Sequence, residues 1–156
     1  MIKYIIASED DIELLIQSRL EMLQVVNDLP ENYTFTDELI VNSREYFTTA
    51  NQTTILAIDK KVVGCATMCY LDMMPTFYHP TGKRAHMMNV YTNKQYRRQG
   101  IAFQMLSILI NEAKEKGVTR ISLDATELGR SLYKKLGFAE SNGSMVLNVK
   151  KGQIPS

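Results

Sequence analysis

The 156-residue chain contains no tryptophan, only two cysteines and two histidines, and no excess of charge of either sign. Both cysteines, Cys65 and Cys69, fall on one face of a predicted strand, where four residues separate their Cα atoms by roughly 13 Å. A disulfide spans at most ~7 Å between Cα atoms, and no Cys or His pair at metal-ligand spacing accompanies them. We therefore expect neither a disulfide nor a metal site, and we place both thiols in the core.

Charge and hydropathy exclude two further classes of partner. The 18 basic and 17 acidic residues leave a net charge of +1, and the basic residues are scattered as short pairs. Nucleic-acid binders usually carry a clear basic excess or stripe, so no nucleic-acid partner is expected. No apolar stretch approaches the roughly 20 residues that cross a bilayer, and acids follow Met1–Ile6 where a signal peptide would continue its apolar core. We expect a cytoplasmic protein without membrane contact.

The residues that are present predict alternating strands and helices in one domain covering residues 1–156. The period of the apolar residues separates the two kinds of element. Predicted strands cover 2–6, 53–58, 62–71, 84–92 and 118–124, with one or two closing strands in 138–149. One predicted helix begins at Ser8, and three others cover 37–50, 99–116 and 126–137. This order predicts an α/β (mixed α+β) fold, with helices on the faces of a mixed sheet.

The stretch that carries chemistry follows the predicted strand 84–92. Residues 95–102, with the sequence QYRRQGIA, form a tight basic turn that enters a helix on small residues. Such a turn directs free backbone N–H groups outward at the positive end of a helix dipole, which makes an anion site. Gly100 has no Cβ, so a phosphate oxygen can approach its amide closely. Arg97 and Arg98 can add charge-assisted contacts.

A second motif stands about thirty residues later, Leu132-Tyr133-Lys134-Lys135-Leu136-Gly137-Phe138. With the basic turn before it, this motif resembles the GNAT superfamily of acyl-CoA-dependent N-acetyltransferases over about residues 84–138. The resemblance implies an enzyme that moves an acetyl group from acetyl-CoA to a primary amine of a small molecule or peptide, by direct attack in a ternary complex. It also implies a single domain whose mostly antiparallel sheet splays between strands 84–92 and 118–124, with helices on both faces.

The resemblance further implies how acetyl-CoA would bind. The pantetheine arm would enter the gap between the splayed strands and pair with backbone groups near Val90, Tyr91 and Thr92. The pyrophosphate would rest on a run of backbone amides, with Arg97 opening the motif. These amides belong to Arg98, Gln99, Gly100, Ile101, Ala102 and Phe103. Both assignments agree with the physics of the turn.

Acid and base candidates complete the expected site. In the family, a tyrosine at the place of Tyr133 commonly sits near the thioester sulfur, where it would protonate the departing thiolate. The acceptor must be a neutral amine, because an ammonium has no lone pair to attack a carbonyl. Strand 84–92 contains no acid, so the candidate bases are Asp124, at the end of the next strand, and His86, a residue type suited to the task.

The acceptor and two other functions stay open at this stage. The loops 27–35 and 72–83 combine Met and aromatic residues with a few acids, which suits a cationic amine with a nonpolar body. The same residues are equally typical of a subunit contact, so a homodimer is compatible with the sequence. A non-catalytic acyl-CoA sensor would keep the phosphate turn without a base, and a polyanion-binding domain would use Arg97 and Arg98.

Overall fold

A computed structural model describes residues 1–150 of the chain. The strands are β1 (Lys3–Ile6), β2 (Gln52–Asp59), β3 (Lys61–Asp72), β4 (Lys83–Thr92) and β5 (Arg120–Leu123). The helices are α1 (Ile12–Val26), α2 (Asp37–Thr49), α3 (Ile101–Glu115) and α4 (Arg130–Lys135). All five strands form one sheet in the order β1-β2-β3-β4-β5, antiparallel except for the parallel pair β4–β5. The predicted α+β class and mixed sheet are confirmed.

Local signals in the sequence account for most element boundaries. Ser8 and Asp11 form a capping box at the turn that leads into α1. The side chain of Thr36 accepts a hydrogen bond from the Leu39 amide and caps α2. Lys60 has a left-handed φ of 65° in the tight turn between β2 and β3.

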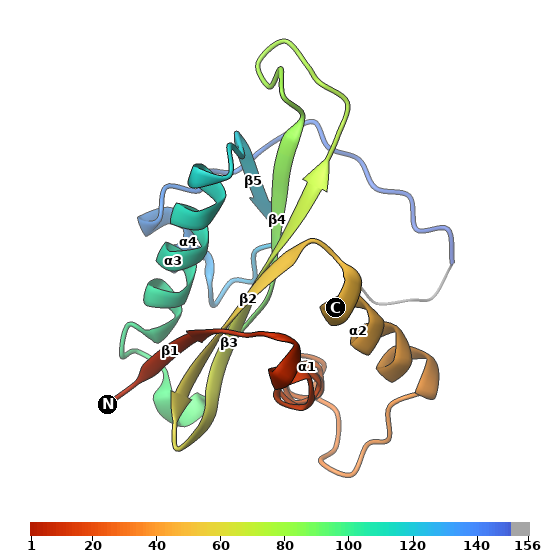
Figure 1. The fold of residues 1–156 in the computed structure, drawn as a ribbon, viewed down its shortest axis with the longest axis vertical. Helices are drawn as coiled ribbons and strands as arrows, with labels where there is room; N and C mark the ends of the chain where they lie inside the picture. The colour runs from red at the N-terminus through yellow and green to blue at the C-terminus, as the bar shows by residue number, and fades with distance from the viewer. Residues whose placement is uncertain (151–156) are drawn as a thin grey trace.

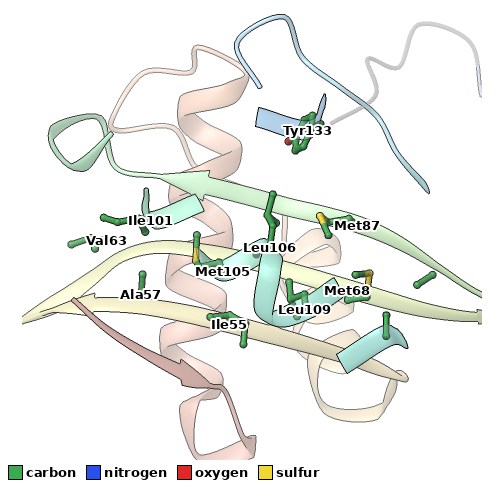
Figure 2. Packing of buried hydrophobic residues seen from close by; sticks show 13 residues of the cluster. Ile55, Ala57, Val63, Met68, Met87, Ile101, Met105, Leu106, Leu109 and Tyr133 are labelled. Atoms are coloured by element: carbon green, nitrogen blue, oxygen red, sulfur yellow. The ribbon is translucent and has the colours of Figure 1, made fainter. Parts of the chain in front are cut away.

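The helices cover both faces of the sheet (Figure 1), with α3 and α4 on one face and α1 and α2 on the other. The α3 cluster includes Met105, Leu106 and Leu109, all fully buried against residues of β2, β3 and β4 (Figure 2). On the other face, Leu15 and Leu23 of α1 belong to a second buried cluster with Leu56, Cys65 and Tyr91. Both cysteines are buried and unbonded, as predicted. Within residues 1–150, no helix is both long and apolar enough to cross a membrane.

The two parallel strands separate after a short paired stretch. Residues 84–87 of β4 pair with residues 120–123 of β5, and residues 88–92 continue without a partner on that side. At the point of separation β4 also contains a bulge. Met88 and Tyr91 are three residues apart, but their partners on β3, Thr67 and Cys65, are two residues apart. Asn89 in this bulge has a left-handed φ of 59°. The predicted splay between the two strands is therefore confirmed, at the end of β4 that leads into the basic turn.

Two expectations near the C-terminus are wrong. The predicted closing strands do not form, because residues 139–150 run along the surface as exposed chain without secondary structure. Apolar residues such as Met145 and Val146 favour a strand only where a neighbouring strand offers hydrogen bonds and a face to pack on. The predicted helix 126–137 is shorter and begins at Arg130; residues 127–129 form a turn instead, and the Thr126 hydroxyl caps this turn by accepting the Gly129 amide.

Candidate active site

The basic turn is held in place from three directions. The Asn93 amide donates to the Val63 carbonyl at 2.8 Å, and the Asn93 side chain accepts the Gln95 amide at 3.0 Å. The Tyr96 hydroxyl donates to Asp59 at 3.0 Å, which ties the turn to the end of β2. The turn therefore meets α3 at a fixed position beside the end of β4.

The start of α3 is an open backbone surface. Gly100 precedes the helix in the left-handed conformation, with φ of 80°, and a Cβ added there would meet no atom within 4 Å. Within residues 1–150, no backbone hydrogen bond is donated by the amides of residues 98–103, and Gln104 is the first to donate, to the Gly100 carbonyl at 3.0 Å. These unpaired amides beside a glycine that leaves space free suit a phosphate group.

The side chains of the two arginines differ in their contacts. Arg97 Nε donates to the Thr92 carbonyl at 3.1 Å and so links the turn to the last residue of β4. Arg98 has a left-handed φ of 63° and an exposed side chain that makes no hydrogen bond within the described chain. The remaining residues of the predicted phosphate site divide by burial. Ile101 is buried in the core, Ala102 is half-buried, and Gln99 and Phe103 are exposed.

The three predicted pantetheine residues lie on the stretch of β4 that β5 does not cover. The side chain of Tyr91 packs with the α1 cluster, and Val90 packs against the α3 cluster. Thr92 Oγ1 is a buried polar atom that has no hydrogen-bond partner within residues 1–150. A buried hydroxyl without a partner is costly, so a polar ligand group alongside β4 would satisfy it.

Tyr133 lies on α4 at the edge of the α3 cluster (Figure 2). The residue is 9% exposed, and its ring meets Phe138 edge-to-face with 6.1 Å between centroids. Burial raises the pKa of the Tyr133 phenol above its ordinary value, so the group stays protonated at neutral pH. Leu128 precedes α4 and is 75% exposed.

The structure brings the two base candidates together. His86 on β4 pairs in register with Ser122 on β5, and its Nδ1 lies 2.7 Å from the Ser122 hydroxyl. Its Nε2 lies 3.6 Å from Asp124 Oδ2. The Asp124 side chain is 99% exposed, whereas that of His86 is 26% exposed.

A cavity of about 500 Å³ opens between α1, α2 and the sheet, next to His86. Alternation along β4 explains why His86 faces it, since Ala85 and Met87 pack on the α3 side. Its polar lining consists of Arg19, Asn42, Ser43, Thr67, His86 and Asn89. Its remaining walls are Tyr46, Phe47, Cys69, Leu71 and Met88. Neither of the loops expected to form the acceptor site, 27–35 and 72–83, contributes a lining residue.

Sequence reasoning missed the most polar part of this cavity. Arg19 Nη1 donates to Asn89 Oδ1 at 3.3 Å, and Asn89 Nδ2 donates to Thr67 Oγ1 at 3.2 Å. A signal for Arg19 is present in the sequence, because it stands three and four residues from apolar positions of α1, in the middle of the stripe that faces the sheet. A charged residue in such an apolar stripe indicates a cavity or solvent-filled gap at that point of the helix–sheet interface.

Residues 1–150 contain no group of three or more His, Cys, Asp or Glu side chains arranged to hold a metal ion. The features that stand out are therefore an amide-lined helix start, a splayed strand pair and an adjoining cavity with a histidine in its wall. This combination is compatible with a phosphorylated ligand at the edge of the sheet and a second ligand in the cavity.

Comparison with known proteins identifies the class. The acetyltransferase (GNAT) family matches residues 19–138, and the chain belongs to this family. A predicted acetyltransferase from Clostridium acetobutylicum, solved with acetyl-CoA, is 31% identical, with a TM-score of 0.83 over 96% of this chain and 97% of that one. The proposed resemblance to the superfamily is confirmed.

Two further similar proteins match the chain over a shorter stretch or at lower sequence identity. A probable glucosamine 6-phosphate N-acetyltransferase 2 of Oryza sativa subsp. japonica is 32% identical over 82 residues, which are 53% of this chain and 49% of that protein. The chain thus aligns with about half the length of this curated relative. An aminoglycoside acetyltransferase from an uncultured soil metagenomic sample, in complex with sisomicin, shares the fold at 17% identity, with a TM-score of 0.76 and coverage of 96% and 97%.

Proposed function

We propose that this protein is an N-acetyltransferase that transfers the acetyl group of acetyl-CoA to a primary amine. The observation that carries the proposal is the start of α3, where the amides of residues 98–103 are unpaired and Gly100 leaves space free. Few ligand groups other than a phosphate or pyrophosphate would use so many amides at once. Family membership supports acetyl-CoA as the bearer of that group.

The free stretch of β4 supports the rest of the co-substrate. An extended pantetheine arm can pair with the backbone of residues 88–92, because β5 ends its pairing at Met87 and leaves that edge open. The hydroxyl of Thr92 lies unpartnered in this stretch. With the pyrophosphate at Gly100, the arm would run along β4 toward the point where the strands separate.

His86 is the general base that the geometry favours. It lines the cavity that would hold the amine, whereas Asp124 is fully exposed and does not. In this mechanism His86 accepts a proton from the ammonium, and Asp124 stabilises the imidazolium that results. The neutral amine nitrogen then attacks the thioester carbonyl, forming a C–N bond and a tetrahedral intermediate with a negative oxygen and a positive nitrogen, and this nitrogen loses its second proton to solvent.

Tyr133 would complete the reaction as the acid. When the intermediate collapses, the C–S bond breaks and its electron pair passes to sulfur. Tyr133 donates its phenolic proton to the departing thiolate and recovers a proton from solvent. Burial raises the pKa of Tyr133, so the phenol is protonated when the thiolate forms; because a thiol has a lower pKa than a phenol, the help that Tyr133 gives to the departing thiolate is modest. Tyr133 and His86 lie on opposite faces of β4, with the open edge of β4 between them.

Two measurements test this function. Thermal unfolding is followed with acetyl-CoA, with adenosine diphosphate and with buffer; a ligand at 100 times its Kd stabilises the protein by about 2.7 kcal/mol. Release of CoA thiol is then followed with a panel of primary amines. We expect a saturable rise in Tm and amine-dependent thiol release, with His86→Gln losing most of kcat and Asp124→Asn losing less.

The outcomes separate the competing functions. A rise in Tm without thiol release on any amine would indicate a non-catalytic acyl-CoA sensor. No rise at millimolar acetyl-CoA would refute both the enzyme and the sensor. If Asp124→Asn loses more kcat than His86→Gln, then the base is Asp124 and the assignment to His86 is wrong.

A further inference from the structure

The cavity beside His86 contains one positive charge that the protein does not neutralise. Arg19 is half-buried on α1, and both of its hydrogen-bond acceptors are neutral: Asn89 Oδ1 at 3.3 Å and Met22 Sδ at 3.4 Å. Within residues 1–150, no carboxylate oxygen lies within the 4.0 Å of an ion pair with Arg19. The arginine of α2 behaves differently, since Arg44 pairs with Glu13 at 2.5 Å.

The guanidinium has donors to spare on the side of the cavity. Nη1 makes both recorded contacts, and Nε and Nη2 make no hydrogen bond within the described chain. Neither atom is sealed from solvent, because the fully buried unpartnered side-chain atoms in residues 1–150 are Arg84 Nε and Thr92 Oγ1. Arginine presents such donors as a planar fork that matches a carboxylate or a phosphate.

The rest of the cavity offers nothing that would attract a second positive charge. Its walls include no Asp and no Glu, and the lining residues that can carry a charge as cations are Arg19 and His86. Partial desolvation lowers the pKa of Arg19, which reflects the cost of keeping the cation there without a partner. An anion in the cavity would offset that cost, whereas a polyamine would add to it.

We infer that the acceptor is an amine that also carries an anionic group, a carboxylate or a phosphate, and that Arg19 binds this group while His86 faces the amine. The inference rests on the proposed function for the role of the cavity. It reverses the expectation from the sequence that acids near the site would select a cationic amine. The neutral side chain of Asn89, which itself donates to Thr67 Oγ1, accepts from the guanidinium without competing for its charge.

The test compares amines that differ only in the anionic group. One pair is β-alanine and β-alaninamide, and the other is 2-aminoethyl phosphate and ethanolamine. We expect the wild-type protein to favour the anionic member of at least one pair by about tenfold or more in kcat/KM, as for a charge-assisted contact. The pair that shows the preference distinguishes carboxylate from phosphate. Equal or better use of the neutral members overturns the inference without the need for any variant.

Variants then assign the preference to Arg19. Arg19→Met should bring the ratio of anionic to neutral acceptor close to one, mainly through KM, and Arg19→Lys should restore part of it. Arg44→Met is the matched control, because it removes the same charge from the neighbouring helix α2 and should leave the ratio unchanged. If Arg19 only holds Asn89 in place, then Arg19→Met lowers Tm and kcat for both members of a pair equally, and the inference fails.

Failure of the proposed function gives a different pattern. In that case no amine releases thiol, although acetyl-CoA can still raise Tm. Calorimetric titration of 2-aminoethyl phosphate and β-alanine into wild-type and Arg19→Met protein then decides the anion site by itself. Heat of binding to the wild type that is absent from Arg19→Met supports the site, and no binding of either anion overturns it.

Discussion

Replacing Gly100 with alanine tests the phosphate site most directly. In the free protein, a Cβ at this position would meet no atom within 4 Å, so the methyl group itself causes no clash. The φ of 80° is the remaining obstacle, and an alanine in that conformation costs about 1–2 kcal/mol. For a protein of this length, such a cost lowers Tm by about 2–8 °C.

The effect on acetyl-CoA should be larger than the effect on the fold. The methyl group would occupy the space through which a phosphate oxygen approaches the amides of residues 98–103. Loss of one charge-assisted hydrogen bond of about 2 kcal/mol weakens binding about thirtyfold. At a concentration 100 times the wild-type Kd, stabilisation by acetyl-CoA should fall from about 2.7 to about 0.9 kcal/mol.

Gly117 supplies a matched control at the other end of α3. Its φ is 81°, and an added Cβ would touch Lys83 Cδ at 3.7 Å, an ordinary contact with a flexible side chain. Gly117→Ala should therefore cost a similar Tm and keep the full response to acetyl-CoA, measured by the same thermal titration. If Gly100→Ala responds like the wild type, or if Gly117→Ala loses the response equally, then the helix start does not hold the phosphate.

Three further predictions concern side chains that are buried in the fold. Tyr133→Phe should lower kcat about ten- to a hundredfold with no change in the Kd of acetyl-CoA, as measured by thiol release and calorimetry; a lower affinity at intact kcat would instead mean that Tyr133 shapes the binding site. Burial raises the pKa of Cys65 to about 12, and Cys65 lies in the core cluster of α1, so at pH 8 an aromatic disulfide reagent should react with Cys65 only after unfolding in urea. Fast reaction of Cys65 in the native protein would show that the sheet opens. Leu106→Ala should cost about 2–5 kcal/mol of unfolding free energy in urea, because Leu106 is fully buried against the sheet; a loss below about 1 kcal/mol would contradict the packing of α3.

Local backbone chemistry was readable from the sequence. The basic turn at residues 97–100 and the small side chain of Ala102 predict a helix start with outward-facing amides, and this prediction depends only on the local sequence. Gly100 is needed there because the backbone has a positive φ. The order and extent of the first five strands also followed from apolar period and turn residues.

The absence of strands in residues 139–150 could not be predicted from the local sequence in the same way. Residues 145–149 are as rich in β-forming residues as β5, yet the structure leaves them exposed and unpaired. A strand depends on what lies beside it, and neighbours distant in sequence are set by the tertiary fold. The start of α4 also differs from the prediction: Thr126 caps a turn at residues 127–129, and the helix begins only at Arg130.

The sequence by itself determined the co-substrate end of the candidate site, because that end is built from consecutive backbone groups. The tertiary structure decided the acceptor end. Arg19 and Asn89 stand 70 residues apart, and His86 meets Ser122 across 36; no local pattern indicates that these side chains share a cavity or face one another. Whether a charge is neutralised depends on its neighbours in space, so only the fold of residues 1–150 shows that Arg19 has no carboxylate partner there, and the proposed class of acceptor rests on that fold.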